Sequence, residues 1–177
     1  MNYYIFKDKN ILVRTDSHML PDASLWEELS NSDSFDNMFG ESVYSYTAAS
    51  LPADGGAVTP SGCGFIPLRQ YFAENDDDES ARAGRAAGLL NWRSAYAFCP
   101  ACGAPLCDDG HLTARICTKC GRQYFPRIEP CIIVLITRGK ELLLARHRMR
   151  NQDVYTCIAG FIEIGESAEQ AVVREVR

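Results

Sequence analysis

The stretch from Gly160 to Glu166 reads Gly-Phe-Ile-Glu-Ile-Gly-Glu, and after seven further residues the chain continues Arg174-Glu-Val-Arg177. Two glycines near a carboxylate, followed by an Arg-Glu pair, are typical of a turn that leads into a helix. The simplest alternative is an amphipathic surface helix after a glycine-rich turn, with no site attached. In either case the stretch marks the end of a strand and the start of a helix.

The capping pattern locates that helix. Ser167 and Gln170 have the S-x-x-Q spacing of a capping box, which predicts a helix that begins near Ala168. Residues three and four apart share a helix face, so Glu175 would lie beside positions 178 and 179. Arg174 is expected to orient a carboxylate rather than to react.

The spacing resembles the Nudix box, whose pattern is G-x5-E-x7-R-E-U-x-E-E-x-G-U, with U a bulky aliphatic residue. Every fixed position that the chain reaches is filled, by Gly160, Glu166, Arg174, Glu175 and Val176. Nudix enzymes hydrolyse a nucleoside diphosphate linked to another moiety, and Mg2+ or Mn2+ neutralises the phosphate charge while water attacks phosphorus. The resemblance implies that Glu175 and Glu166 are catalytic, and that Glu175 binds the metal.

A second motif lies upstream. Two Cys-x2-Cys pairs are separated by fourteen residues and consist of Cys99, Cys102, Cys117 and Cys120. Gly103 and Gly121 follow the pairs where the chain must turn. Four thiolates in this arrangement predict a closed, structural zinc site, and a redox-active or disulfide pair is the alternative. The other cysteines lack ligand spacing and are expected to be buried free thiols: Cys63, Cys107, Cys131 and Cys157.

The composition is that of a folded protein. Hydrophobic residues make up 46% of the 177 residues, which excludes a disordered chain, and no uninterrupted apolar run approaches a membrane span. The net charge of -5 gives no overall electrostatic footprint for nucleic acid, so any RNA contact would be local. The stretch Met1–Asn10 lacks the basic and apolar segments of a signal peptide. We therefore expect a cytoplasmic protein without a membrane partner.

The N-terminal residues predict a mostly β domain. Short apolar stretches at Tyr4–Phe6 and Ile11–Val13 alternate with turns, as in strands. The spacing within Ser24–Glu27 predicts a helix start. Ala53–Gly62 is interpreted as a loop, and Asn75–Glu79 as a solvated acidic run that favours the N-terminus of the next helix.

That next helix is predicted from Ser80 to Phe98. Its expected buried stripe consists of Ala83, Ala87, Leu90, Ser94 and Ala97. After the second cysteine pair, Cys131–Thr137 and Glu141–Ala145 predict two strands joined by a hairpin. Tyr155–Ala159 is predicted as the strand that leads to the glycine turn.

Together these patterns predict an α+β protein with an N-terminal β-rich domain with helices (1–98), a zinc ribbon (99–125) and the first half of a Nudix α/β/α sandwich (126–177). This order, with Tyr124–Val134 between the motifs, closely resembles the NADH pyrophosphatase (NAD diphosphatase) branch of the Nudix hydrolases, over residues 89–177. The resemblance implies hydrolysis of NAD(H) to nicotinamide mononucleotide and AMP, removal of NAD caps from RNA, and a homodimer. It also implies structural Zn2+ and catalytic Mg2+ or Mn2+.

The same resemblance implies individual roles. Ala159 aligns with a residue that offers its backbone carbonyl to the metal. Phe161 stands where an aromatic ring stacks on the nicotinamide, and its alternative role is that of a core aromatic next to a glycine turn. Phe125 occupies the position of a substrate-contacting Tyr and would keep the ring without the hydroxyl. Arg69 matches a substrate-binding Arg, with an ordinary surface Arg as the alternative.

Parts of the family pattern lie beyond Arg177. These are the second Glu pair of the box and the S-Q-P-W-P-F-P segment that distinguishes this branch. We interpret the chain as C-terminally truncated and expect it to be inactive as it stands. The alternatives are a Nudix hydrolase for another dinucleotide or ADP-ribose, and a non-catalytic zinc-ribbon module that binds RNA or a protein. The codons that follow Arg177 would discriminate among them.

Overall fold

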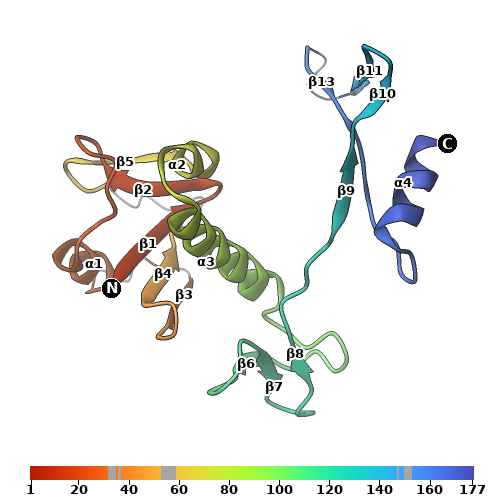
Figure 1. Cartoon of the computed structure of the whole chain (residues 1–177). Helices are drawn as coiled ribbons and strands as arrows, with labels where there is room; N and C mark the ends of the chain where they lie inside the picture. Colours follow the sequence, from red (N-terminus) through yellow and green to blue (C-terminus); the bar gives the residue numbers. More distant parts are fainter. Residues whose placement is uncertain (32–34, 36, 53–58, 147, 150–152) are drawn as a thin grey trace. The chain divides into compact units, whose positions relative to one another are not determined.

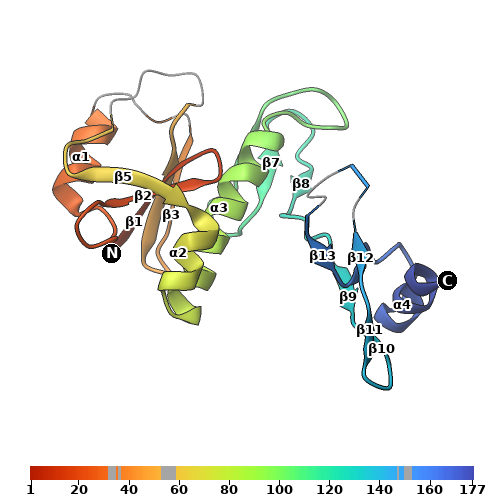
Figure 2. The same cartoon turned by 90° about the horizontal axis from the view of Figure 1, so that it is seen from above.

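The computed structural model describes residues 1–31, 35, 37–52, 59–146, 148–149 and 153–177. The chain divides into two compact units, Met1–Pro126 and Arg127–Arg177, which Figure 1 and Figure 2 show in two views. The architecture is α+β, as predicted, with an N-terminal sheet, a cluster of four cysteines and a C-terminal segment of strands with a helix. The finer predicted boundary near residue 98 remains a prediction.

The first unit is built on a sheet whose described strands have the order β3-β4-β1-β2-β5. The strands span Asn2–Lys7 (β1), Asn10–Arg14 (β2), Asn37–Glu41 (β3), Tyr46–Ser50 (β4) and Cys63–Pro67 (β5). β1 and β4 are parallel, and the other neighbours are antiparallel. The two strands predicted in the N-terminal stretch are confirmed as β1 and β2. Of the predicted loop Ala53–Gly62, residues 53–58 lie outside the described residues.

Helices cover both faces of this sheet. They span Ala23–Asn31 (α1), Leu68–Glu74 (α2) and Asp77–Ala95 (α3). Tyr4 and Phe6 pack towards α2 and α3, whereas Ile5 and Leu12 pack towards α1. Successive strand residues point to opposite faces. Burial on both faces therefore explains why the strands are continuous apolar runs rather than alternating ones.

Aspartates begin two of these helices earlier than we predicted. The predicted cap of α1 was Ser24, but Asp22 accepts the backbone N–H of Leu25 at 3.0 Å and the Ser24 hydroxyl at 2.8 Å. α3 begins at Asp77 rather than Ser80, because Asp76 accepts the backbone N–H of Glu79 at 2.8 Å. No pattern predicted α2, whose N-terminus has no capping side-chain hydrogen bond.

The buried face of α3 is rotated relative to the predicted stripe. Ala83 and Leu90 are buried as predicted, but the other buried positions are Ala86 and Leu89. Ser94 is exposed. The prediction extended the helix to Phe98, whereas it ends at Ala95 and leaves the last stripe position outside.

Glu79 corrects the prediction of a solvated acidic run. Its side chain is only 14% exposed. One carboxylate oxygen accepts hydrogen bonds from the hydroxyls of Tyr4 at 2.7 Å and Tyr71 at 2.9 Å, and Arg82 binds the other at 2.8 Å. Burial and the adjacent Glu79 carboxylate raise the pKa of Tyr4 to about 12. Glu79 therefore ties β1, α2 and α3 together.

The cysteine-rich segment follows α3. Its short antiparallel strands span Leu106–Asp108 (β6), Arg115–Cys117 (β7) and Gln123–Tyr124 (β8). Gly103 and Gly121 have φ values of 73° and 69°, which confirms the predicted glycine turns after the cysteine pairs. Arg93 of α3 pairs with Asp108 at 2.5 Å, and Arg115 donates to the Arg93 carbonyl at 2.9 Å. These contacts hold the cysteine-rich segment against α3.

The second unit contains short strands and one described helix. They span Cys131–Val134 (β9), Ile136–Arg138 (β10), Glu141–Leu143 (β11), Ala145–Arg146 (β12), Tyr155–Thr156 (β13), Ile158–Phe161 (β14) and Ala168–Val176 (α4). The predicted hairpin is confirmed as β10 and β11 around Gly139, which has a φ of 59°. The preceding predicted strand is interrupted at Leu135, because β9 pairs with β14 instead. α4 begins at Ala168 with both capping-box hydrogen bonds, as predicted.

The cysteines outside the cluster differ in exposure. Cys63 is buried as predicted, but Cys107 and Cys131 are exposed and Cys157 is half-buried. Cys107 lies on β6 and Cys131 on β9, and both of these strands are short. Within the part of the chain that the structure describes, no helix combines the length and apolar character needed to cross a membrane.

Candidate functional site

Gly160 and Glu175 meet closely in the second unit. Gly160 lies on β14 opposite Ile132 of β9, and α4 packs against both strands through the buried Ala171. A methyl group added at Gly160 would lie 2.2 Å from the Cδ and Oε1 atoms of Glu175. Only glycine therefore leaves room for this carboxylate against the strand.

Arg174 connects the glutamates of the turn and the helix. Its guanidinium donates to both carboxylate oxygens of Glu166, at 2.8 and 2.9 Å, and forms an ion pair with Glu175. It also donates to the backbone carbonyl of Phe161 at 2.7 Å. The turn itself is closed by Glu166, which accepts the backbone N–H of Glu163 at 3.0 Å. The Arg174 guanidinium thus binds two carboxylates and the backbone at the end of β14.

These contacts keep Glu166 ionised. The hydrogen bond from Arg174, followed by the backbone N–H of Glu163, lowers the pKa of Glu166 to about 2. The same pair raises the pKa of Arg174. The side chains of Glu166 and Glu175 are 14% and 26% exposed. Two carboxylates at a partly exposed junction can supply oxygen ligands to a hard divalent cation, which takes six or more oxygens in total.

The remaining predicted site residues lie in different places. Ala159 is on β14, next to Gly160 and in register with Ile133. Phe161 ends β14 and is 63% exposed, so it is not a core aromatic among the described residues. Phe125 is 54% exposed and Arg69 is exposed on α2, and both belong to the first unit.

The four cysteine sulfurs predicted to bind zinc form one cluster. All lie within 4.8 Å of one another, and in the described part of the chain this is the one group of three or more candidate metal ligands. The Sγ atoms of Cys99 and Cys120 are 3.7 Å apart, and those of Cys102 and Cys117 are 3.4 Å apart. A tetrahedral zinc with Zn–S bonds of about 2.3 Å separates its sulfurs by about 3.8 Å. The donor set therefore fits zinc.

Hydrogen bonds to two of these sulfurs favour the thiolate form. The backbone N–H groups of Cys120 and Lys119 lie 3.3 and 3.4 Å from the Cys117 sulfur and lower the pKa of that thiol. The Tyr124 hydroxyl lies 3.2 Å from the Cys99 sulfur and lowers its pKa to about 6. Sequence reasoning missed Tyr124. Its position four residues after the last cysteine was the available signal.

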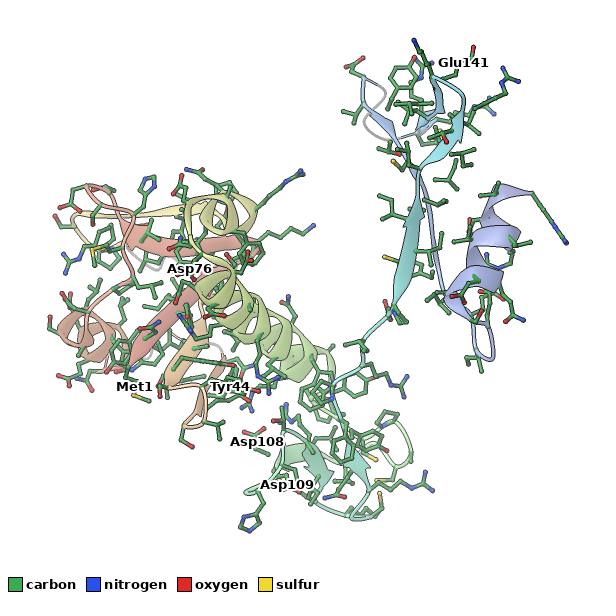
Figure 3. The ribbon with its side chains drawn as sticks, viewed as in Figure 1. Met1, Tyr44, Asp76, Asp108, Asp109 and Glu141 are labelled. Carbon is green, nitrogen blue, oxygen red and sulfur yellow. The ribbon has the colours of Figure 1, made fainter. Side chains whose placement is uncertain are left out.

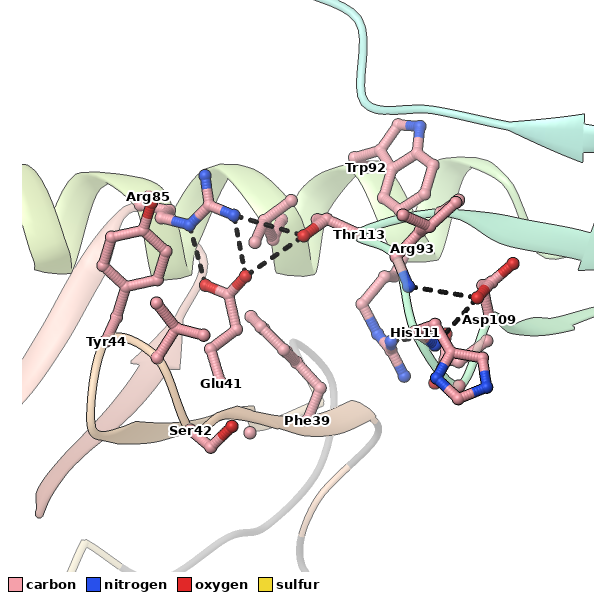
Figure 4. Close-up of a pocket in the computed structure, with 17 residues that line it drawn as sticks. Phe39, Glu41, Ser42, Tyr44, Arg85, Trp92, Arg93, Asp109, His111 and Thr113 are labelled. Carbon is pink, nitrogen blue, oxygen red and sulfur yellow. Dashed lines mark hydrogen bonds and ion pairs between the residues drawn. The ribbon is translucent and has the colours of Figure 1, made fainter.

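A cavity of about 450 Å³ lies between the β3–β4 connection, α3 and the cysteine-rich segment. Tyr44 and Asp108, labelled in Figure 3, are among its lining residues. Figure 4 shows Glu41 facing Arg85, which binds both of its carboxylate oxygens at 2.7 Å, while Thr113 contacts the same pair. Because Glu41 and Arg85 neutralise each other, this contact links β3 to α3, and we assign no ligand to the cavity.

The family model of the NUDIX domain matches residues 127–177. NAD-capped RNA hydrolase NudC of Stutzerimonas stutzeri (strain A1501) is 41% identical over 138 residues, which are 78% of this chain and 48% of that protein. The proteins of the same name from Pseudomonas aeruginosa (strain LESB58) and Pseudomonas putida (strain W619) are 42% and 44% identical over 116 residues, 66% of this chain and 42% of each relative. The chain spans about half the length of the curated relatives it matches.

Proposed function

Because the chain carries a NUDIX domain and is similar over most of its length to NAD-capped RNA hydrolases of the NADH pyrophosphatase family, we propose that this protein hydrolyses the diphosphate bond of NAD(H). The products are nicotinamide mononucleotide and AMP, and the same reaction at an RNA 5′ end removes an NAD cap. The approach of Glu175 to Gly160 is the observation that carries the proposal, because it places a partly exposed carboxylate against the end of β14.

The residues of the second unit have distinct tasks in this reaction. A bound Mg2+ or Mn2+ supplies positive charge against the diphosphate and a site for the attacking water. Glu175 and the backbone carbonyl of Ala159 would hold it, as oxygen donors of the type these cations prefer, and Glu166 is the second carboxylate assigned to catalysis. Arg174 lowers the pKa of Glu166 and fixes the direction of both carboxylates through its hydrogen bonds. It therefore positions carboxylates and does not itself react.

Substrate recognition is assigned to three exposed side chains. Phe161 presents a ring that can stack on the nicotinamide. Phe125 offers a second ring that lacks the hydroxyl of the family's Tyr, and Arg69 supplies a cation from the first turn of α2. Phe161 lies directly after Gly160, which supports its place near the reacting diphosphate.

Zinc is proposed as the ion of the cysteine cluster, in a structural role. Four protein sulfurs complete a tetrahedral set, so no position remains for a reacting water. Mg2+ or Mn2+ is proposed as the catalytic ion, as stated above. A homodimer is also proposed, on the resemblance to the family alone, and a cytoplasmic location is proposed because Met1–Asn10 lacks the segments of a signal peptide.

A substrate panel tests the activity. The enzyme for this test is residues 1–177 followed by the part of the Stutzerimonas stutzeri relative that lies beyond its counterpart of Arg177, here called the completed chain. With Mn2+ present, it should release AMP from NADH and free a 5′-monophosphate end on NAD-capped RNA. Faster hydrolysis of ADP-ribose than of NADH would contradict the substrate assignment. Binding of RNA with no hydrolysis of any of these compounds would favour the non-catalytic zinc-ribbon module.

Replacing Phe161 by Ala in the completed chain tests the stacking role. The change should lower kcat/KM for NADH by about 5-fold to 150-fold relative to a diphosphate that lacks the nicotinamide, because stacking on one base contributes about 1 to 3 kcal/mol. Ile164→Ala is the matched control, since Ile164 is a fully exposed apolar residue of the turn that follows Phe161. Equal losses on both substrates would show that the Phe161 ring does not contact the nicotinamide.

A further inference from the structure

The hydroxyl of Tyr124 lies 3.2 Å from the sulfur of Cys99, inside the cysteine cluster. Cys99 is 2% exposed, so water has little access to this sulfur. A thiolate bound to a metal has no proton and can only accept a hydrogen bond, and a tyrosine hydroxyl has a proton to donate. The geometry therefore fits an O–H donor that points at a metal-bound sulfur.

Tyr124 is held in this position from two sides. Its backbone pairs with Arg115 in the β7–β8 ladder. Its ring lies 6.3 Å from the ring of Tyr96, which in turn lies 6.0 Å from that of Trp92 on α3. This row of aromatic rings runs from the last turns of α3 to the cluster. The hydroxyl is thus oriented before any metal binds.

We propose that Tyr124 is a positioning residue of the zinc site, which donates a hydrogen bond to the Cys99 thiolate and slows the loss of zinc. The proposal rests on the assignment of zinc to the cluster. Four thiolates around one Zn2+ leave a net negative charge, and a donor directed at one sulfur stabilises that charge. Cys117 receives comparable support from the backbone N–H groups of Lys119 and Cys120.

The hydrogen bond also has a consequence for the neighbouring residue. Phe125 follows Tyr124 directly, and consecutive residues of an extended chain point in opposite directions. Anchoring Tyr124 on the cluster therefore fixes the backbone that presents the exposed Phe125 ring to solvent. The zinc site would in this way support a residue assigned to substrate contact.

The test measures zinc release from the 177-residue chain after zinc loading. Tyr124→Phe removes only the hydroxyl and keeps the ring. Zinc transfer to an excess of the chromogenic chelator 4-(2-pyridylazo)resorcinol should become about 10-fold to 100-fold faster, the range typical for loss of an outer-shell partner of a metal ligand. Tyr44→Phe is the matched control, because Tyr44 contacts Arg85 through its ring and lies outside the cluster. Its release rate should equal that of the parent.

A spectroscopic readout separates this role from a general loosening of the fold. In the Co2+-loaded protein, loss of the hydrogen bond raises the energy of the sulfur lone pair, so the sulfur-to-cobalt charge-transfer band should move to lower energy in Tyr124→Phe and not in Tyr44→Phe. If the variant does not fold, NMR of the cadmium-loaded parent replaces it, with scalar coupling expected between the metal and the Tyr124 hydroxyl proton.

The possible results are distinct. A parent protein that binds no zinc refutes the zinc assignment and this inference with it. A parent that binds zinc, together with a Tyr124→Phe variant of unchanged release rate and unchanged charge-transfer energy, refutes the role of Tyr124 alone. A hydroxyl proton observed without coupling to cadmium refutes it as well.

Discussion

At the scale of single residues, the close approach of the Glu175 side chain explains why position 160 of the motif is a glycine. The carboxylate of Glu175 occupies the space that a side chain at position 160 would need. Arg174 then holds Glu175 and Glu166 on the two sides of its guanidinium. The Gly, Glu, Arg and Glu of the motif are thus parts of one contact network rather than independent matches.

Gly160→Ala should displace the Glu175 carboxylate while preserving the fold. The new methyl would collide with the end of a flexible side chain and not with backbone, so the helix can remain in place. We expect kcat/KM for NADH in the completed chain to fall at least about 10-fold, because a small misplacement of a catalytic group is costly. The melting temperature of the 177-residue chain should change little.

Gly88→Ala provides the control for this substitution. Gly88 lies within α3 and has no atom within 4 Å of the added methyl. Alanine is favoured over glycine in a helix interior by roughly 0.5 to 1 kcal/mol, so the free energy of unfolding should rise. Activity should be unchanged. Full activity of Gly160→Ala would show that the carboxylate position is not important for the reaction.

The ion pair between Arg174 and Glu166 predicts a pH dependence. The folded pKa of Glu166 is about 2, below the value near 4.5 of the free side chain. The stabilisation is therefore fully present above about pH 4.5 and is lost as the pH falls towards 2. Carboxyl NMR should give a Glu166 titration midpoint near 2, and Arg174→Gln should move it back towards 4.5. A midpoint near 4.5 in the parent would contradict the ion pair.

At the scale of elements, hydrogen-bonding side chains decide where the segments begin. The capping box of α4 and the glycines after each cysteine pair are local patterns, and the structure has them where the sequence predicted them. The cysteine cluster is the element with the clearest consequence for stability. A structural zinc contributes about 10 to 16 kcal/mol of apparent binding free energy to the fold that it closes.

Cys117→Ser should therefore remove zinc and unfold the cysteine-rich segment. We expect the parent to contain one zinc per chain by metal analysis under reducing conditions, and the variant to contain much less and to lose the amide dispersion of β6, β7 and β8. Cys107→Ser is the control, because Cys107 lies on β6 with its side chain exposed and outside the cluster. A parent without zinc would contradict the site, as would equal zinc content in Cys117→Ser.

Features that depend on contacts between distant segments could not be predicted. α2 has no capping side-chain hydrogen bond, and it is held by Tyr71, which is buried together with residues of β1 and α3. Glu79 looked solvated in the sequence because its two tyrosine partners come from β1 and α2. Tyr124 was missed for the same reason, since its partner Cys99 lies 25 residues earlier in the chain. Local spacing does not identify the partners of such side chains, even where, as for Tyr124, it places the residue near a motif.

At the scale of the whole molecule, the proposed functions are divided between the two units. The glycine turn, the carboxylates and Phe161 belong to Arg127–Arg177, whereas the cysteine cluster, Phe125 and Arg69 belong to Met1–Pro126. The family motif was recognisable because its residues lie close together in sequence. The assignment of Phe125 and Arg69 to substrate contact depends on the resemblance, because no contact among the described residues of that unit distinguishes them.

The most direct test is AMP release from NADH with Mn2+, measured for three proteins: the 177-residue chain, the completed chain, and the completed chain with Glu175→Gln. The 177-residue chain offers Glu175 and Glu166 as the acidic residues of the motif, and a hard cation at a diphosphate needs several fixed oxygens. We predict turnover only by the completed chain, and a loss of at least about 100-fold in Glu175→Gln, as expected for removal of a catalytic carboxylate. Comparable turnover by the 177-residue chain, or by the Glu175→Gln protein, would contradict this placement of the catalytic centre.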